Sequence, residues 1–299
     1  MTLSRRQFLT KSTAATVGFL GLRHLIAAGY TSASTTHHLA FPDLIPDSVG
    51  LVDLLPGFDY SVVSVAGRQM DDGLLVPAGQ DGMAAFAGPQ GTTVLVCNHE
   101  LSQNSTGNGA FGDNNELVRE DRWESLFDAG RRSHPCLGGT STMTYDTRSN
   151  RLLRHELSLA GTVRNCAGGP TPWNSWISCE ETTQTTGETY GQDHGYNFEV
   201  PALERGLVNP NPLKAMGRFV HEAVAVDPTT GIVYQTEDRS DGLFYRFIPN
   251  RNGALHEGGK LQALATWDAK SLDTRNWDVE NVRTGGPIPS RWIDIDNVE

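Results

Sequence analysis

Short β-like runs, each ended by Gly, Asn, Asp or Pro, set the limits on how this chain can fold. Residues 142–146 lead through Arg-Ser-Asn to residues 151–154, and residues 223–227 lead through Pro-Thr-Thr-Gly to residues 232–235. Side chains that alternate between two faces, with an Asp placed to organise the turn, are typical of strand–turn–strand units. Long apolar runs that would favour helices are scarce, so the sequence predicts an all-β protein.

Carboxylates recur where these strands end. Three apolar strands finish in the runs Asn98-His99-Glu100, Cys179-Glu180-Glu181 and Thr236-Glu237-Asp238. A meander of short strands with acidic residues at corresponding ends is typical of a β-propeller, whose blades aim similar strand ends at one central channel. At roughly 40–50 residues per blade, the chain would form about five or six blades. A β-sandwich has similar strand spacing and remains the alternative.

One stretch differs from this pattern. Residues 114–130 contain Leu117, Trp123, Leu126 and Phe127 among charged residues. Because this spacing suits one apolar helical face, we expect a short amphipathic helix inserted between two strands.

The N-terminus has the pattern of a targeting signal. Residues 4–9 read Ser-Arg-Arg-Gln-Phe-Leu, and a weakly apolar stretch follows over residues 14–22. This pattern is typical of a twin-arginine export signal, which is read by the translocation machinery and is not part of a fold. Arg23 and His24 interrupt the apolar stretch, which excludes a spanning helix of about 20 apolar residues. We therefore expect a periplasmic or secreted protein with no stable membrane span.

The expected organisation has three parts. They are a signal peptide over residues 1–28, a linker over residues 29–50 and a β-propeller over residues 51–299. Because signals of this type serve proteins that cross the membrane already folded, a metal or cofactor installed beforehand would be consistent with it.

The net charge of the chain limits which binding partners are expected. The chain has 24 basic and 35 acidic residues. Residues 1–28 contain four basic and no acidic residues, so the remainder has 20 basic against 35 acidic residues and a formal charge of −15. Such a surface repels polyanions, so we expect no nucleic-acid partner. The excess carboxylates either form a solvated surface or converge on hard cations such as calcium.

The chain has four cysteines, which are Cys97, Cys136, Cys166 and Cys179. In an exported protein an even count first suggests disulfides, with three possible pairings. Metal ligation by a thiolate is the competing use.

Several residues have both a functional and a purely structural interpretation. Glu100 ends a strand as a ligand or as a solvated turn residue, and Cys166, flanked by Asn and glycines, is either a ligand or a small buried thiol. Glu222 is a carboxylate placed directly before an apolar run. Arg239 could bind an anion such as phosphate with two hydrogen bonds, or it could pair with a neighbouring Asp.

Several better-known sites are absent from the sequence. It has no Gly-x-Ser-x-Gly elbow, no phosphate loop of the Gly-x4-Gly-Lys type, no His-Glu-x-x-His and no cysteine pairs with zinc-finger spacing. No spacing of Ser, His and Asp selects a catalytic triad, so no catalytic side chain is assigned.

A set of motifs in a fixed order resembles a known family. They are Asp81-Gly82-Met83-Ala-Ala-Phe86, Cys97-Asn-His-Glu100, Asn165-Cys-Ala-Gly-Gly-Pro-Thr-Pro-Trp173, Trp176-Ile-Ser-Cys-Glu-Glu181, His221-Glu-Ala-Val-Ala-Val-Asp-Pro228 and Thr236-Glu-Asp-Arg239 followed by Phe244-Tyr-Arg-Phe247. Together they resemble the PhoX-type alkaline phosphatases, which also carry twin-arginine signals. The match runs from about Leu54 to the last residue.

The resemblance implies a β-propeller phosphomonoesterase with a calcium and ferric-iron cluster, acting as a monomer on phosphate esters outside the cytoplasm. Lewis-acid polarisation of the phosphoryl group would take the place of a protein nucleophile. By motif position the metal ligands would be Cys166 and Glu222 first, followed by Glu100, Glu180 and Glu237.

The chain departs from the family pattern at its end. Family members continue past the point that matches residues 291–296 into an Arg-Gly-Glu-Gly motif, which is not present here. We therefore expect an incomplete last blade and an incomplete active site. Two other functions stay open, namely a non-catalytic calcium-binding propeller and a propeller hydrolase of another class, such as a lactonase.

Overall fold

The computed structural model describes residues 42–105, 107–267, 271–277 and 279–299. The chain divides into two compact units, Met1–Ser61 and Val62–Glu299. The predicted signal peptide lies outside the described residues. Among the described residues, no helix is both long enough and apolar enough to cross a membrane.

The described part of the first unit is organised by one carboxylate. Ile45 and Leu54 form a bridge, and the Asp47 carboxylate accepts hydrogen bonds from the backbone N–H of Val49 at 3.1 Å and from the Tyr60 hydroxyl at 2.6 Å. The Tyr60 hydroxyl and the backbone donors hold the pKa of Asp47 at about 2. A local turn, and not a packed core, therefore gives these residues their structure.

The second unit is built from antiparallel β-sheets. The first sheet contains β1 (Gln80–Ala87), β2 (Thr93–His99), β3 (Gly138–Asp146) and β4 (Arg151–Thr162). The second contains β5 (Asn165–Pro170), β6 (Ser175–Glu180) and β7 (Asn197–Pro201). The third contains β8 (His221–Val226), β9 (Val233–Glu237), β10 (Phe244–Pro249), β11 (Gly259–Thr266) and β12 (Ser290–Asp294).

Among the described residues, helix is confined to short 3-10 segments. These are η1 (Pro89–Gly91), η2 (Glu120–Ser125), η3 (Gly130–Arg132), η4 (Lys214–Met216) and η5 (Leu255–Glu257). The prediction of an all-β protein is confirmed. In each sheet the strands pair in chain order, as expected for a meander.

The predicted count of about five or six blades is not confirmed, because the first and third sheets, Gln80–Thr162 and His221–Asp294, each use more chain than the assumed 40–50 residues. The described residues form three sheets, and the first of them extends from Gln80 to Thr162 because a long segment separates β2 from β3.

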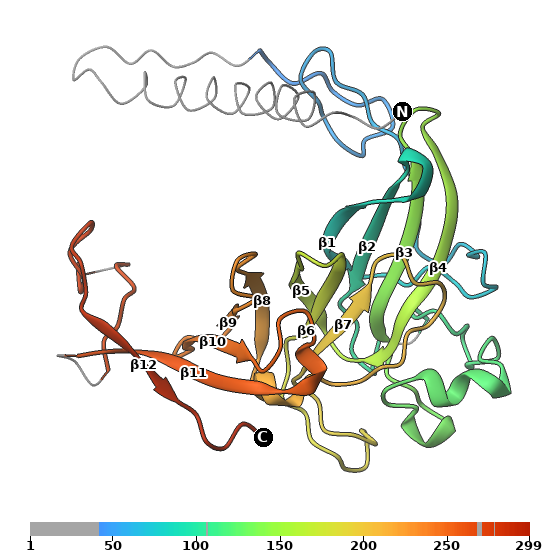
Figure 1. Ribbon diagram of the computed structural model, residues 1–299. Coiled ribbons are helices and arrows are strands. Elements are labelled where there is room, and N and C mark those ends of the chain that lie inside the picture. The colour runs from blue at the N-terminus through green and yellow to red at the C-terminus, as the bar shows by residue number, and fades with distance from the viewer. Residues whose placement is uncertain (1–41, 106, 268–270, 278) are drawn as a thin grey trace. The chain divides into compact units, whose positions relative to one another are not determined.

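The first strands of the three sheets lie side by side (Figure 1). Their backbones approach so closely that glycine is required. A Cβ at Gly82 in β1 would lie 2.7 Å from the Cα of Ala167 in β5, and a Cβ at Gly169 in β5 would lie 2.1 Å from the carbonyl oxygen of Val224 in β8. The glycines of the two motifs therefore set the distance between neighbouring sheets.

Two apolar clusters fill the space between neighbouring sheets. One joins the first and second sheets through Phe86, Val94, Val96, Leu159, Trp176, Phe198 and Val200. The other joins the second and third sheets through Ile177, Cys179, Met216, Val224, Val233, Phe247 and Leu261. Each fully buried side chain of this size stabilises the fold by roughly 1.5–3 kcal/mol, so these clusters hold the sheets together.

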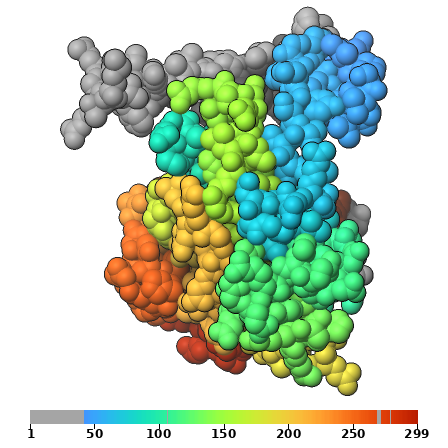
Figure 2. All heavy atoms as spheres, turned by 90° about the vertical axis from the view of Figure 1, so that its right-hand side faces the viewer, coloured from blue at the N-terminus to red at the C-terminus, as the bar shows by residue number. Residues whose placement is uncertain are grey.

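The segment between β2 and β3 differs from its prediction. The expected amphipathic helix over residues 114–130 is reduced to η2 and η3, and the rest is turns. The apolar side chains of this stretch pack against the rest of the protein although they do not lie on a helix. Leu126 joins a cluster with Leu157 and Ala160, and the N–H of Phe127 donates to Ala160 O at 3.0 Å. The segment (cyan to green in Figure 2) thereby covers part of the edge strand β4.

A buried amide ties the first sheet to the second. The Asn98 side chain, at the end of β2, donates to Ala167 O at 2.7 Å and accepts from Trp176 Nε1 at 2.9 Å and Ser178 Oγ at 2.8 Å. It is fully buried. Each of its partners would lose its hydrogen bond to this amide if Asn98 were shortened.

We expect Asn98→Ala to lower the free energy of unfolding by about 2 kcal/mol or more, because each buried polar group left without a partner costs about 1–3 kcal/mol. Urea unfolding followed by tryptophan fluorescence measures this change. Asn209→Ala, at an exposed position, is the control and should unfold like the unchanged protein. Equal midpoints for both variants would contradict the cross-linking role of Asn98.

Candidate metal centre

The first strand of each of the three sheets begins with a β-bulge. In β1, β5 and β8 a β-bulge inserts one extra residue relative to the paired strand, after the pairs Gln80–His99, Asn165–Glu180 and His221–Glu237. A bulge bends its strand and changes the direction of a side chain. The residues that follow these pairs on the bulged strands are Asp81, Cys166 and Glu222.

The paired strands contribute a second set of residues. Immediately after β2, β6 and β9 come Glu100, Glu181 and Asp238. Because the strands are antiparallel, the end of each of these strands lies beside the start of the bulged strand. Each sheet therefore brings two ligand-type residues to one edge, and the first strands of the sheets lie side by side.

Three of these six residues meet closely. The ligand atoms of Cys166, Glu181 and Glu222 all lie within 4.8 Å of one another. The Cys166 sulfur lies 3.7 Å from Glu222 Oε2 and is buried. The other three lie near them, because the charges of Asp238, Asp81 and Glu100 all act on Glu222.

Crowding of acidic groups changes their pKa values. Burial raises the pKa of Glu222, and the charges of Asp238, Asp81 and Glu100 raise it further. Burial and the hydrogen bond with Asp238 raise the pKa of Glu181 to about 7, even though Arg164 acts in the opposite direction. Both effects disfavour the ionised carboxylates, and a bound cation would favour them.

The Cys166 thiol responds in the same way. Burial raises its pKa well above the ordinary value of 9.0, and the Glu222 charge adds to this effect. A thiolate at this position therefore requires a positive charge beside it, such as a coordinated metal ion.

Arg164 brings a cation to the cluster. It lies in the turn between β4 and β5 with a φ of 52°, an uncommon value for a residue with a side chain. Its guanidinium donates to Glu100 Oε1 at 3.2 Å and pairs with Glu181 Oε2. The sequence interpretation missed Arg164, although its position directly before the Asn165-Cys166 motif was a usable signal.

Glu180 and Glu237, two of the predicted metal ligands, do not lie in the cluster around Cys166. The residues that follow them in the chain, Glu181 and Asp238, lie there instead. Glu180 is fully buried and accepts hydrogen bonds from Val163 N at 2.9 Å, Gly195 N at 2.8 Å and His194 Nδ1 at 2.7 Å. Successive side chains of a strand point to opposite faces. Glu181, and not Glu180, therefore faces Cys166.

The same alternation applies at the end of β9. Glu237 accepts from the Tyr245 hydroxyl at 3.0 Å and from Leu243 N at 3.1 Å, which holds the following turn. Asp238 is the residue that faces Glu181 and Glu222. The anion-binding interpretation of Arg239 finds no support in its contacts, because Arg239 Nε pairs with Asp241 Oδ1 at 3.0 Å and both side chains are exposed.

The histidines of the motifs support the fold. His99 contacts Ala78 O at 3.0 Å and Ser141 Oγ at 2.8 Å, and His221 Nε2 contacts Gly217 O at 3.0 Å. Burial lowers the pKa of each to about 4, so both rings are neutral near pH 7.

The disulfide interpretation of the cysteines is wrong, since all four thiols are free and buried.

The donor set of this centre suits two kinds of metal ion. Carboxylate oxygens are the ligands that calcium prefers, and the acidic residues of the three sheets supply several of them. A thiolate together with carboxylates suits a transition metal such as iron. The residues therefore fit the calcium and iron that the resemblance implies.

A known protein family matches most of the chain. The family model described as "Alkaline phosphatase PhoX" matches residues 39–297. The chain belongs to the PhoX alkaline phosphatase family. Among solved structures it is similar to Pseudomonas fluorescens PhoX in complex with vanadate, a transition state analogue, at 16% identity and a TM-score of 0.45. The similarity covers 69% of this chain and 51% of that one, so this chain spans about half the length of that PhoX. No curated protein matches the chain.

We expect a pH dependence of stability from Glu181 when chelator keeps the protein free of metal. Its pKa is raised from 4.5 to about 7 on folding. The folded chain therefore binds this proton more tightly than the unfolded chain does. The free energy of unfolding should fall as pH rises from about 4.5 to about 7. We expect a loss of about 1–2 kcal/mol, less than 1.36 kcal/mol per pKa unit would give, because water reaches part of the carboxyl group.

Urea unfolding at about pH 5 and about pH 8 measures this effect, and the comparison of variants isolates it. Glu181→Gln should reduce the difference between the free energies of unfolding at these two pH values. Glu188→Gln, at an exposed position, should not. If both variants keep the pH dependence of the unchanged protein, the carboxyl group of Glu181 does not cause it.

Proposed function

We propose that this chain is a metal-dependent phosphomonoesterase that acts on phosphate esters outside the cytoplasm. Its membership in the PhoX alkaline phosphatase family supports the reaction class. The observation that carries the proposal is the convergence of Cys166 in β5, Glu222 in β8 and Glu181 directly after β6, with their ligand atoms within 4.8 Å of one another. Such a donor set is a reason to expect metal-assisted hydrolysis.

We assign the ligands by position. Cys166, Glu181 and Glu222 would hold the transition metal, for which ferric iron is the proposed identity. Asp81, Glu100 and Asp238 surround them and would contribute oxygen ligands to calcium. This assignment replaces the predicted Glu180 and Glu237 by the residues that follow them. When bound, the cations would polarise the phosphoryl group and offset the negative field of the carboxylates.

Arg164 is the proposed phosphate contact, in place of Arg239. Its side chain is 45% exposed, and its guanidinium pairs with both Glu100 and Glu181. If metal ions take those two carboxylates as ligands, the planar guanidinium becomes available to phosphoryl oxygens, to which arginine binds with two parallel hydrogen bonds.

The larger organisation is part of the same proposal. The three sheets, with their equivalent bulges and adjoining first strands, are blades of a β-propeller around the candidate centre. Residues 1–28 form a twin-arginine signal, residues 29–50 a linker and residues 51–299 the phosphatase domain, which is exported to the periplasm or secreted and functions as a monomer.

Hydrolysis of p-nitrophenyl phosphate tests the reaction class. Activity should disappear with a chelator and return with calcium and iron, and metal analysis should find iron in the purified protein. If calcium binds but no ester is hydrolysed under any of these conditions, the calcium-binding interpretation replaces the proposed one. Hydrolysis of a lactone without phosphatase activity would favour the other hydrolase class.

Variants test the ligand assignment. We expect Cys166→Ser and Glu222→Gln each to lower kcat/KM by about 100-fold or more, because even residues that only orient metal ligands contribute about 10–100-fold. Cys166→Ser should also lower the iron content. Glu204→Gln, at an exposed position, is the control. Unchanged iron in Cys166→Ser would refute the thiolate ligand.

Glu181→Gln and Glu237→Gln form a matched pair that tests the choice between neighbouring carboxylates. Only the first should reduce metal content, because Glu237 is held by Tyr245 and Leu243. An equal or larger loss in Glu237→Gln would restore the assignment made from the motif alone.

A further inference from the structure

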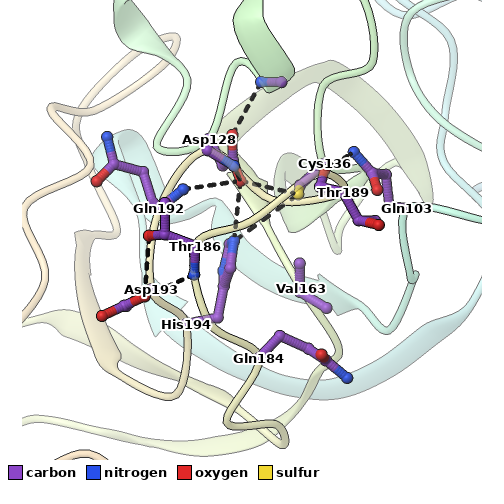
Figure 3. A network of polar contacts seen from close by, with 12 residues as sticks. Gln103, Asp128, Cys136, Val163, Gln184, Thr186, Thr189, Gln192, Asp193 and His194 are labelled. Carbon is purple, nitrogen blue, oxygen red and sulfur yellow. Dashed lines mark hydrogen bonds and ion pairs between the residues drawn. The ribbon is translucent and has the colours of Figure 1, made fainter.

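A second group of ligand-type side chains lies outside the candidate metal centre. Asp128 lies between η2 and η3, Cys136 lies between η3 and β3, and His194 lies in the loop before β7. All three side chains are almost completely buried. Figure 3 shows that the carboxylate, the thiol and the imidazole point toward one another.

The distances between the three donor atoms match one face of a tetrahedral metal site. Cys136 Sγ lies 3.6 Å from Asp128 Oδ2 and 3.8 Å from His194 Nε2, and the oxygen lies 3.2 Å from that nitrogen. Tetrahedral zinc with ordinary bond lengths separates sulfur from oxygen or nitrogen by about 3.6 Å, and oxygen from nitrogen by about 3.3 Å. The atoms could therefore surround an ion without large movement.

The second nitrogen of His194 has the partner that metal-bound imidazoles use. His194 Nδ1 lies 2.7 Å from Glu180 Oε1, whose other oxygen accepts from Gly195 N at 2.8 Å. A carboxylate at Nδ1 fixes the ring orientation and leaves Nε2 for the metal. Glu180, which does not face Cys166, is therefore placed to orient His194.

The Asp128 carboxylate is also held in place. Its Oδ1 accepts from Gly130 N at 2.8 Å and its Oδ2 accepts from Gly191 N at 2.8 Å. A Cβ at position 191 would lie 2.8 Å from Oδ1, so glycine allows this approach. Gly130 and Gly191 also line a hollow of about 340 Å³, together with Tyr190, whose ring contacts that of His194.

We infer that Asp128, Cys136 and His194 form a second metal site, which binds one divalent transition-metal ion of the zinc type. A thiolate and an imidazole select such an ion over calcium. Binding replaces the protons on Cys136 Sγ and His194 Nε2 with a divalent ion, so the net charge of the buried group does not change. The site would connect the 128–136 segment to the loop before β7, and it does not depend on phosphatase activity.

Cobalt(II) tests this site, because it occupies zinc sites and a thiolate ligand gives it a charge-transfer absorption. The experiment uses the full chain with Cys166→Ser, so that Cys166 cannot contribute a thiolate. We expect a thiolate–cobalt absorption that saturates as cobalt is added, and we expect zinc to abolish it. Adding Cys136→Ser should remove the absorption and weaken zinc binding by at least roughly tenfold.

Two further variants in the Cys166→Ser background complete the test. Asp128→Asn keeps the size of the side chain and should weaken zinc binding, even if Cys136→Ser does not fold. Cys97→Ser alters another buried thiol, whose sulfur contacts Asn98 O, and should leave the absorption unchanged. No thiolate–cobalt absorption in the Cys166→Ser protein would overturn the inference and leave a hydrogen-bonded group of side chains. Absorption that survives Cys136→Ser would overturn the ligand assignment.

Discussion

A one-residue β-bulge, repeated at the start of β1, β5 and β8, is the constraint on which the arrangement of this molecule depends. In each sheet three residues of the bulged strand span the distance of two residues of its partner. Asp81, Cys166 and Glu222 follow the pairs at which the bulges begin. Without the bulges, the regular alternation of a strand would fix the faces to which these side chains point. The close approach of the three bulged strands, which Gly82 and Gly169 permit, then brings the residues of separate sheets together.

The resulting cluster is costly for the metal-free chain. Burial and mutual repulsion raise the pKa values of Glu181 and Glu222, and Arg164 offsets only part of this repulsion. A ligand that binds only the folded state stabilises it by mass action. Cations that neutralise the cluster would therefore stabilise the fold as well as supply the chemistry. Function and stability would then be coupled at this position, because the same carboxylates would determine both.

Adjacent acidic residues divide their tasks according to strand geometry. Glu181 faces Cys166, whereas Glu180 contacts His194 on the opposite side of the strand. Asp238 faces the cluster, whereas Glu237 holds the turn before β10. Both pairs lie at the ends of inner strands, so the two neighbouring residues of each pair contact different parts of the structure. The proposal of a second metal site follows from this division, because Glu180 is buried and accepts hydrogen bonds from His194 and from backbone N–H groups.

The sequence by itself determined the class of fold, the meander order of the strands and the family, because alternation, turn residues and ordered motifs are local properties of the chain. It also indicated Cys166 and Glu222, which the structure brings within 3.7 Å of each other. Only the tertiary structure decided which member of each acidic pair faces the cluster. Alternation places neighbouring side chains on opposite faces of a strand, and the packing of the sheets against one another sets which face meets the cluster. The same holds for Arg164 and for the Asp128, Cys136 and His194 group, whose partners lie far apart along the chain and meet only because the sheets and loops pack together.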